Sequence, residues 1–469
     1  MSVPNLALPP PPARVHLVGI GGIGTSGLAR ILHTWGYRVS GSDAQGSALT
    51  AVLTAEGIPV AIGHADPERA VAADLVVATA AARDDNAELV AARAAGVPVV
   101  KRAELLGWLA NARRCVAVAG SHGKSTTSGM LVAALRELGD DPSYAIGAVL
   151  AATGTNAAPG GGAAMVVEAD EYDLSFLHLT PDVAIVTNVD YDHPDLFPDG
   201  ATYDRAFARF VAGIRPGGTL VLAADDPGGA RLRAAGGLQP GVRVVGFGQN
   251  EDAEWRLLRA PRGWAVAPLE GEPVPLPLRV PGEHNARNAV AALAALMALG
   301  HDSEAAVAAL GAYTGIGRRF EAKGAAAGVT VIDDYAHHPS EIRATLRAAR
   351  DAFSTRRLWA VFQPHTYSRT KALLDGFADA FGDADRIAVL EVYAARETDA
   401  LGVGARDLVA RLPAGTLHVQ GPRDAAARLA TLVEPGDVVL TLGAGDVTDA
   451  GPHLLALLAE RVATAEATP

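Results

Sequence analysis

The chain is 469 residues long, which at roughly 150 residues per domain indicates about three domains rather than a single core. Hydrophobic residues make up 49% and charged residues 20%, the balance of an ordinary globular protein, which excludes collagen-like and low-complexity classes. The formal net charge of −12 argues against a nucleic-acid or anionic-membrane binder, because both need a basic surface, but it leaves room for local pockets that hold small anions.

Three features of the sequence indicate in which compartment of the cell the protein is found. The single cysteine, Cys115, excludes a disulfide framework and argues against a cysteine-based metal site. Residues 1–13 are proline-rich and have no basic segment, so no signal peptide is expected. No apolar run approaches the length of a membrane span. We therefore expect a cytoplasmic protein without membrane insertion, present as a monomer or a weak homodimer.

Strand and helix patterns alternate over the first part of the chain, as in a Rossmann-like domain whose parallel sheet is covered on both faces. We predict that this domain spans residues 1–113. The predicted strands are Arg14–Val18, Tyr37–Ser40, Asp74–Ala78 and Val97–Val100, and the predicted helices run to about Trp35, over Asn86–Ala95 and over Ala103–Ala110.

The loop after the first predicted strand reads Gly19-Ile-Gly-Gly-Ile-Gly24, a G-x-G-x-x-G pattern. Such glycines permit a tight turn and a close backbone approach to a diphosphate, which the next helix N-terminus also attracts. Asp43, at the end of the following strand, is placed to accept hydrogen bonds from a ribose. Taken alone, the pattern favours NAD binding over a purely structural turn, and the nucleotide itself stays open.

The alternation continues in two further domains. A P-loop ATPase-like central domain is predicted over residues 114–316, and a second Rossmann-like domain over residues 317–469. The central strands are Cys115–Ala119, Ala163–Val167, Val183–Thr187, Thr219–Ala223 and Val242–Gly246, followed by an antiparallel excursion over Trp255–Leu278 and a helix over Pro281–Gly300. The C-terminal strands are Val329–Ile332, Leu358–Phe362, Ile387–Leu390, Leu417–Gln420 and Val438–Leu442.

The segment Gly120-Ser-His-Gly-Lys-Ser125 follows an apolar strand and resembles a phosphate loop that is shortened at its start. Backbone N–H groups in such a loop converge on phosphate oxygens, Lys124 is placed for the β- and γ-phosphates, and the Ser125 hydroxyl for Mg²⁺. The whole chain has only four lysines (Lys101, Lys124, Lys323 and Lys371). A lysine between Gly and Ser is therefore the strongest local signal of phosphate binding.

Two acidic clusters follow neighbouring predicted strands: Glu168-Ala-Asp-Glu-Tyr-Asp173 and Asn188-Val-Asp-Tyr-Asp-His193. Carboxylates at the C-terminal ends of parallel strands lie at the crevice where such sheets bind ligands. Glu168 and His193 would then face the phosphates and help hold a divalent metal, although imidazole is a less usual ligand of Mg²⁺. Either cluster alone would favour a solvated loop, but both together after a phosphate loop favour a metal site.

Polar groups elsewhere leave more than one interpretation open. Glu283-His-Asn-Ala-Arg-Asn288 suits a helix cap, and alternatively places asparagine amides on a purine edge. In the last domain, Asp333-Asp-Tyr-Ala-His-His-Pro-Ser-Glu341 and Gln363-Pro-His-Thr-Tyr-Ser-Arg-Thr370 follow successive strands, where open sheets place ligands. Arg318 and Arg319 at the domain junction could clamp a phosphate or carboxylate.

These motifs together resemble the Mur ligase family. The resemblance rests on G-I-G-G-I-G, G-S-H-G-K-S-T-T, E-A-D-E-Y-D, T-N-V-D-Y-D-H, H-N-x-x-N, R-R-F, D-D-Y-A-H-H-P and Q-P-H-T-Y-S-R-T, which occur in family order from residue 19 to residue 370. It implies three α/β domains with mainly parallel, doubly wound sheets. It also implies that the first glycine loop holds the diphosphate of a UDP-sugar rather than NAD, with Asp43 facing the uridine end.

The resemblance implies roles for individual residues. The expected catalytic residues are Lys124, Glu168, His193, His337 and Arg369, and the expected metal ligands are Ser125, Glu168 and His193. The expected ATP-binding residues are Gly120, Ser121, His122, Gly123, Lys124, Ser125, Thr126, Asn288 and Arg319. The expected substrate-binding residues are Gly21, Gly22, Ile23, Gly24, Ser42, Asp43, His193, Tyr335, His337 and Arg369.

The implied activity is ATP- and Mg²⁺-dependent amide formation, in which L-alanine is joined to the lactyl carboxylate of UDP-N-acetylmuramate through an acyl phosphate, as in peptidoglycan precursor synthesis. A recycling ligase that adds a whole murein tripeptide to the same UDP-sugar is the alternative within the family. An NAD-dependent oxidoreductase would explain Gly19–Gly24 and Asp43 but not the phosphate loop or the acidic clusters. A non-catalytic nucleotide-binding regulator would leave complete phosphate and metal motifs unused.

Overall fold

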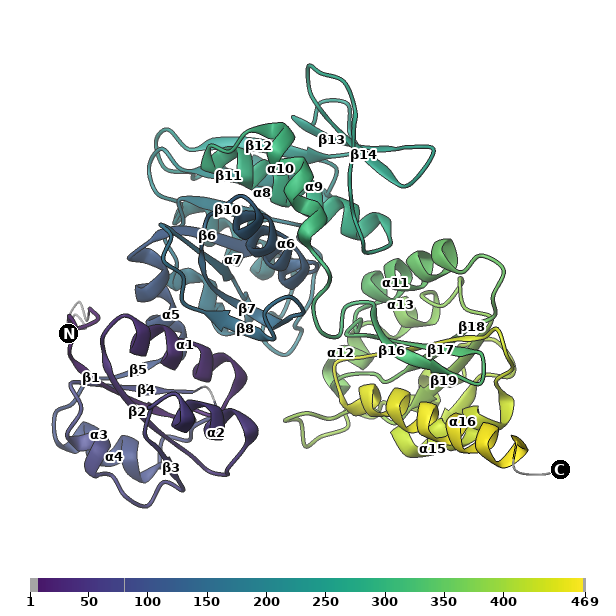
Figure 1. The fold of residues 1–469 in the computed structure, drawn as a ribbon, viewed down its shortest axis with the longest axis horizontal. Helices are drawn as coiled ribbons and strands as arrows, with labels where there is room; N and C mark the ends of the chain where they lie inside the picture. Colours follow the sequence, from purple (N-terminus) through teal and green to yellow (C-terminus); the bar gives the residue numbers. More distant parts are fainter. Residues whose placement is uncertain (1–6, 80, 467–469) are drawn as a thin grey trace.

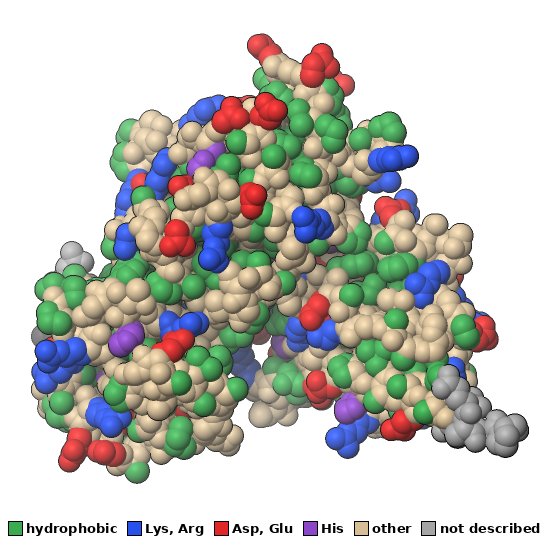
Figure 2. All heavy atoms as spheres, in the orientation of Figure 1, with side chains coloured by type: hydrophobic (Ala, Val, Ile, Leu, Met, Phe, Trp, Pro, Cys, Tyr) green, Lys and Arg blue, Asp and Glu red, His purple; other side chains and the backbone are tan. Residues whose placement is uncertain are grey.

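A computed structural model describes residues 7–79 and 81–466, so the first six residues of the proline-rich stretch lie outside the described part. Three lobes follow one another along the chain, each built on its own sheet, and the N-terminal and C-terminal lobes both adjoin the central one (Figure 1). The predicted three-domain α/β fold is confirmed. Charged side chains of both signs are scattered over the face seen in Figure 2, and a hollow separates the two outer lobes in that view.

The N-terminal lobe contains a parallel five-stranded sheet in the order β3-β2-β1-β4-β5. The strand order reverses beside β1, the position where such sheets bind ligands, and the glycine loop leaves the end of β1 there. The strands are β1 (Arg14–Val18), β2 (Arg38–Asp43), β3 (Val60–Ile62), β4 (Leu75–Ala78) and β5 (Val99–Lys101). The helices are α1 (Ile23–Thr34), α2 (Ala48–Ala55), α3 (Glu68–Val71), α4 (Ala87–Ala94) and α5 (Arg102–Asn111).

The central lobe contains a ten-stranded sheet in the order β15-β14-β13-β12-β11-β10-β6-β9-β7-β8. Its strands are β6 (Arg114–Ala119), β7 (Ser143–Leu150), β8 (Thr155–Ala158), β9 (Ala164–Glu168), β10 (Val183–Val186), β11 (Thr219–Ala223), β12 (Arg243–Gly248), β13 (Trp255–Arg259), β14 (Trp264–Pro268) and β15 (Val274–Pro275). Strands β13–β15 pair antiparallel, which confirms the predicted excursion. The β7–β8 hairpin was not predicted, because its alternating burial is weak and glycines interrupt the region.

The helices of the central lobe cover both faces of this sheet. They are α6 (Lys124–Glu137), α7 (Gly200–Ala212), α8 (Pro227–Ala235), α9 (Glu283–Leu299) and α10 (Ser303–Ala309), with short 3₁₀ turns η1 (Tyr172–His178) and η2 (Leu310–Ala312). Helix α9 is buried from Ala286 to Leu296, apart from the half-buried Arg287, and packs against α6 and the sheet. Its many alanines allow this close approach, and Asn288 is a buried polar side chain near the start of the stretch.

The C-terminal lobe contains a six-stranded sheet in the order β16-β17-β21-β18-β19-β20, parallel except for the edge strand β16. Its strands are β16 (Glu321–Ala326), β17 (Val329–Asp334), β18 (Leu358–Phe362), β19 (Arg386–Leu390), β20 (Leu417–Val419) and β21 (Val438–Leu442). Its helices are α11 (Pro339–Ala352), α12 (Tyr367–Ala372), α13 (Leu374–Ala378), α14 (Ala405–Val409), α15 (Pro422–Leu432) and α16 (Ala450–Glu466), with the 3₁₀ turn η3 (Asp446–Asp449).

The hydrophobic core is distributed unevenly between the lobes. One cluster of buried apolar side chains runs without a break from the N-terminal lobe into the central lobe, from Val15 to Leu232. The two clusters of the C-terminal lobe contain buried residues of that lobe alone, between Val329 and Leu458. In the described part of the chain, no helix is long and apolar enough to cross a membrane.

Gly27 illustrates how closely the first two lobes approach. A Cβ atom added to this α1 residue would lie 2.3 Å from the Ala157 Cβ in β8. We expect Gly27→Ala to lower the free energy of unfolding by about 1–3 kcal/mol, because this overpacking outweighs the helix propensity gained from alanine. Urea unfolding of Gly27→Ala and of the double variant Gly27→Ala/Ala157→Gly measures this. The second change removes the clashing methyl group and should restore most of the loss, whereas equal stability of all three proteins would contradict the packing argument.

Candidate functional site

The phosphate loop joins β6 to α6 in the middle of the central sheet. Gly120 and Gly123 have φ angles of +132° and +81°, which L side chains rarely adopt, and a Cβ on Gly123 would lie 2.5 Å from the Asn288 side chain. The two residues that directly follow β10 hold the loop in place. Thr187 Oγ1 donates to the His122 carbonyl at 2.6 Å, and Asn188 Oδ1 accepts from the His122 N–H at 2.9 Å. The loop therefore presents a fixed backbone to an anion at the N-terminus of α6.

Lys124 lies among carboxylates. Its Nζ donates to the Gly120 carbonyl and to Glu171 Oε2, both at 2.7 Å. Burial alone would lower the pKa of this ammonium, but the charges of Glu171, Asp170 and Glu168 outweigh burial and raise it. The lysine is therefore charged at neutral pH.

Glu171 was not among the predicted site residues, although it lies within the acidic cluster that contains Glu168. Its fully buried carboxylate bonds Lys124 through Oε2 and lies 3.4 Å from His193 Nε2 through Oε1. Position in the sequence showed that carboxylates gather at this strand end but not which of them turns inward. The following residues Asp173 and Leu174 have positive φ angles, an irregular path that no periodic pattern indicates.

A first cavity of about 620 Å³ lies between the central and C-terminal lobes. The structure brings predicted ATP-binding residues from three separate segments to its wall: His122 of the phosphate loop, Asn288 of α9 and Arg319 of the interdomain connection. His284 also lines it and was not predicted. Most of the lining side chains are polar or charged, and apolar side chains such as Phe247 and Phe320 lie among them, a mixture that suits a nucleotide base and ribose.

A second cavity of about 350 Å³ lies between the N-terminal and central lobes. Gly22, Ile23 and Gly24 line it, and Glu168 and Asp170 line it from the central lobe. The predicted glycine loop and the first acidic cluster therefore meet, although some 150 residues separate them in the chain. Lys124 is close enough to both carboxylates for their charges to act on it, so the second cavity ends near the phosphate loop.

The structure places Ser42 and Asp43 behind the glycine loop. Asp43 Oδ2 accepts from the Gly21 N–H at 2.8 Å. Ser42 is fully buried; its hydroxyl bonds Glu88, and its carbonyl accepts from the Gly19 and Ile20 N–H groups. Asp43 thus holds the loop through its side chain, and Ser42 holds it through its backbone carbonyl. Neither residue is part of the lining of the second cavity.

A third group of side chains joins the central and C-terminal lobes. Arg369 of α12 donates to both carboxylate oxygens of Asp192, at 2.8 and 3.1 Å, and both side chains are about 95% buried. His193 Nδ1 lies 3.4 Å from Arg369 Nη2. His337 Nδ1 lies 2.9 Å from the Tyr335 carbonyl, so Nδ1 carries the proton and Nε2 keeps its lone pair. Burial lowers the pKa of His337 to about 3, which keeps the ring neutral.

His122 carries a charge at neutral pH. Burial lowers its pKa, but hydrogen bonds to Asp190 and Glu341 outweigh burial and raise it to about 9. Because folding raises the pKa of His122, its protonated ring adds to the free energy of unfolding. This contribution is fully present below the ordinary pKa of 6.5 and is lost as the pH rises through about 9.

We therefore expect the stability advantage of the wild type over His122→Asn to shrink by up to about 3 kcal/mol between pH 6.5 and pH 10, at about 1.4 kcal/mol per pKa unit. Thermal unfolding of both proteins across this range, with a chelator present, measures the difference. A constant difference across the range would show that His122 is not charged in the folded protein.

Known families match the chain along nearly its whole length. The models described as "Mur ligase family, catalytic domain", "Mur ligase middle domain" and "Mur ligase, glutamate ligase domain" match residues 14–114, 118–296 and 318–445. The chain belongs to the Mur ligase family. This confirms the resemblance seen in the motifs. Family membership also accounts for the glycine loop, so the alternative of an NAD-dependent oxidoreductase is no longer needed to explain it.

Individual Mur ligases resemble the chain closely. The UDP-N-acetylmuramate–L-alanine ligase of Saccharopolyspora erythraea is 49% identical, covering 94% of this chain and 93% of that protein, and that of Streptomyces coelicolor is 46% identical, covering 96% and 98%. The crystal structure of the UDP-N-acetylmuramate-alanine ligase from Thermotoga maritima has a TM-score of 0.76 at 29% identity, covering 97% of this chain and 100% of that one. A murein peptide ligase from Psychrobacter arcticus, 24% identical with a TM-score of 0.69, shares the Mur ligase fold.

Proposed function

We propose that the protein is an ATP-dependent ligase that joins L-alanine to the lactyl carboxylate of UDP-N-acetylmuramate. The names of its relatives at 43–49% identity support this substrate pair. The observation that carries the proposal is the placement of two cavities on either side of Lys124. The first lies beside the phosphate loop at His122 and Gly123, and the second runs from the glycine loop to Glu168 and Asp170, whose charges act on Lys124. Such a layout suits phosphoryl transfer between two bound substrates.

ATP would occupy the first cavity. Asn288 and Arg319 would contact the base and ribose side, while the loop from Gly120 to Thr126 would hold the phosphates with its N–H groups. Lys124 would move its ammonium from the Gly120 carbonyl to the γ-phosphate and stabilise the charge of the transferring group.

UDP-N-acetylmuramate would occupy the second cavity, with its diphosphate on Gly22, Ile23 and Gly24 at the start of α1. Ser42 and Asp43 would act through the loop rather than on the sugar nucleotide, because Asp43 holds the Gly21 N–H and Ser42 holds the loop backbone. The lactyl group would then lie at the other end of this cavity, beside Glu168 and Asp170 and toward the phosphate loop.

The reaction activates a carboxylate, which has no good leaving group at neutral pH. A lactyl oxygen attacks the γ-phosphorus and ADP leaves, which gives an acyl phosphate. The alanine amine then attacks the acyl carbon, inorganic phosphate leaves from the tetrahedral intermediate, and the amine loses its proton. The protein contributes mainly position and charge, with a closed site that keeps water from the acyl phosphate.

The carboxylates around Lys124 also fit Mg²⁺. One ammonium, that of Lys124, faces three carboxylates: Glu168, Asp170 and Glu171. Burial and the charge of Glu171 raise the pKa of Asp170, which shows that negative charge is in excess at this site. Ser125 and Glu168 would hold a first cation through oxygen donors, the usual ligands of Mg²⁺, and His193 would lie at a second metal position beside the phosphates. Bound there, Mg²⁺ would neutralise charge on the phosphate oxygens.

The amino acid would be held by the C-terminal lobe. Arg369, whose guanidinium is fixed by Asp192 and also contacts His193 and His365, would turn an Nη1 N–H toward the alanine carboxylate. His337 offers a lone pair at Nε2 to the ammonium, and its ring lies edge-on to Tyr335 at 5.2 Å. His337 positions the amine rather than carrying its proton away, because its pKa of about 3 makes it a weak base.

The experiment is phosphate release from ATP and Mg²⁺ with UDP-N-acetylmuramate, in parallel with L-alanine, with the murein tripeptide, and with neither. We expect release that requires both the UDP-sugar and L-alanine. Release only with the tripeptide would identify a recycling ligase instead. No release in any mixture would show that the family's motifs lack this chemistry here.

A further inference from the structure

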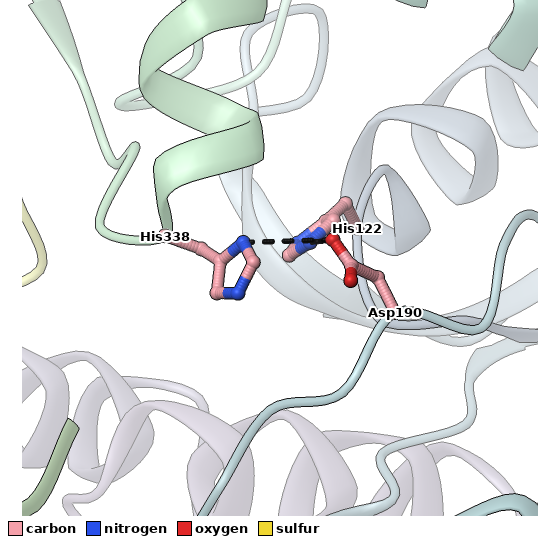
Figure 3. Close-up of side chains that lie close together, drawn as sticks. All are labelled: His122, Asp190 and His338. Atoms are coloured by element: carbon pink, nitrogen blue, oxygen red, sulfur yellow. Dashed lines mark hydrogen bonds and ion pairs between the residues drawn. The ribbon is translucent and has the colours of Figure 1, made fainter. Parts of the chain in front are cut away.

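Three side chains from two lobes converge at the edge of the first cavity (Figure 3): His122 of the phosphate loop, Asp190 after β10, and His338 at the start of α11. One ring nitrogen of each histidine and one carboxylate oxygen all lie within 4.8 Å of one another. His122 Nε2 is 3.3 Å and His338 Nδ1 is 3.7 Å from Asp190 Oδ2. None of the three is among the ligands assigned to Mg²⁺ above.

We propose that His122, Asp190 and His338 form a binding site for a borderline divalent cation of the Zn²⁺ type, which joins the central and C-terminal lobes. Zinc bonds of about 2.0–2.2 Å in tetrahedral geometry place neighbouring ligand atoms roughly 3.3–3.5 Å apart. The observed spacings to Asp190 Oδ2 approach this value before any cation is bound. Two imidazoles and one carboxylate are a donor set that favours Zn²⁺ over Mg²⁺.

The surroundings of the three side chains support this proposal. His122 Nδ1 lies 3.3 Å from Glu341 Oε1, the carboxylate–histidine arrangement that orients an imidazole toward a metal. Ser340 Oγ donates to Asp190 Oδ2 at 2.7 Å and so fixes the carboxylate. These outer contacts come from α11, so the helix that supplies His338 also orients the two ligands of the central lobe.

His338 is not satisfied by the protein alone. Its side chain is 95% buried, yet its Nε2 has no hydrogen-bond partner among the described residues. Its Nδ1 accepts one long hydrogen bond, of 3.3 Å, from the Ser340 N–H. Nδ1 has one lone pair, so a cation there would replace this long hydrogen bond with a stronger interaction, while Nε2 keeps its proton. Asp190 is 43% exposed and lines the first cavity with His122, which gives the cation a path from solvent.

Binding can be followed with Co²⁺, which absorbs visible light strongly when it is four-coordinate and replaces Zn²⁺ in such sites. The full-length protein without nucleotide or UDP-sugar is titrated with Co²⁺, and Zn²⁺ or excess Mg²⁺ is then added. We expect one Co²⁺ per chain, displacement by Zn²⁺ and none by Mg²⁺. Because no substrate is present, the result does not depend on the proposed ligase activity.

Variants assign the signal to these residues. His338→Ala and Asp190→Asn should each weaken Co²⁺ binding by 100-fold or more, and Glu341→Gln by about 10–100-fold, as is usual for an outer partner. His301→Ala is the matched control, since His301 pairs with Asp140 at 3.3 Å without a second imidazole. It should bind Co²⁺ like the wild type.

Circular dichroism and thermal unfolding check that each variant is folded. The proposal is wrong if the wild type gives no four-coordinate spectrum, or if the spectrum persists in both folded variants, His338→Ala and Asp190→Asn. It is also wrong if His193→Ala alone removes the spectrum, because the cation would then occupy the site beside Glu171.

Discussion

Replacing Lys124 with methionine is expected to lower kcat for substrate-dependent phosphate release by about 10²–10³-fold. The reason is the loss of the only lysine ammonium beside the phosphate loop, at the point where charge develops on the transferring phosphoryl group. The same change leaves the fully buried Glu171 without its main cation, so the free energy of unfolding should fall by about 3–5 kcal/mol. Steady-state kinetics and urea unfolding measure the two effects.

A second substitution separates catalysis from folding. Lys124→Met/Glu171→Gln removes both charges, so it should recover much of the lost stability while activity stays low. Lys371→Met is the matched control, because Lys371 is exposed and its Nζ bonds only the Leu401 carbonyl. We expect it to stay within about 0.5 kcal/mol of wild type with unchanged kcat. Near-normal activity in the folded double variant would remove Lys124 from the proposed mechanism.

Replacing Arg369 with alanine is expected to have the second largest effect. Its guanidinium joins α12 to Asp192 of the central lobe in a buried pair, so its removal leaves an unpaired buried carboxylate at a cost of about 3–5 kcal/mol to the interface. It also removes the proposed contact with the alanine carboxylate. We expect kcat/KM for L-alanine to fall by about 10²-fold or more, with a smaller change in KM for ATP.

Arg369→Lys should not restore activity, because an ammonium cannot donate to both oxygens of Asp192 in the same geometry. Arg347→Ala is the control, since Arg347 is 70% exposed and lies 3.6 Å from Asp383. Burial alone would raise the pKa of Asp192, but Arg369 holds it well below its ordinary value. The contribution of the pair is therefore present at neutral pH and is lost only when the pH falls far into the acid range. Equal effects on the KM values of all three substrates would indicate a general loss of structure instead.

The strand ends were predictable from the sequence, and with them most of the functional region. Apolar runs followed by glycine or acidic residues predicted where β1, β6, β9 and β10 end, and the ends of neighbouring parallel strands lie together. The edge strands β3 and β16 were not predicted, because β3 has three residues directly after Pro59, too few for a clear pattern, and β16 is largely exposed and has no apolar run.

Side-chain directions in the irregular loops were not predictable. Glu168 and Glu171 lie in one motif, yet Glu171 bonds Lys124 whereas Glu168 accepts a hydrogen bond from the Gly147 N–H. His193 has a positive φ, of +57°, which turns its ring toward Glu171. Ser42 and Asp43 follow the expected strand, but the glycine loop folds over them and takes their hydrogen bonds. Such outcomes depend on tertiary contacts and not on local pattern.

Because the core is uneven, opening the two lobe boundaries would expose different kinds of surface to water. Parting the first two lobes would open the continuous apolar cluster from Val15 to Leu232 to water, at about 25 cal/mol for each Å² exposed. The C-terminal lobe is attached mainly through ion pairs and hydrogen bonds such as Arg369–Asp192 and Ser340–Asp190, whose groups water can rehydrate. A chain with its third lobe swung outward would therefore expose little additional apolar surface to water, and such a form would have a low tendency to aggregate.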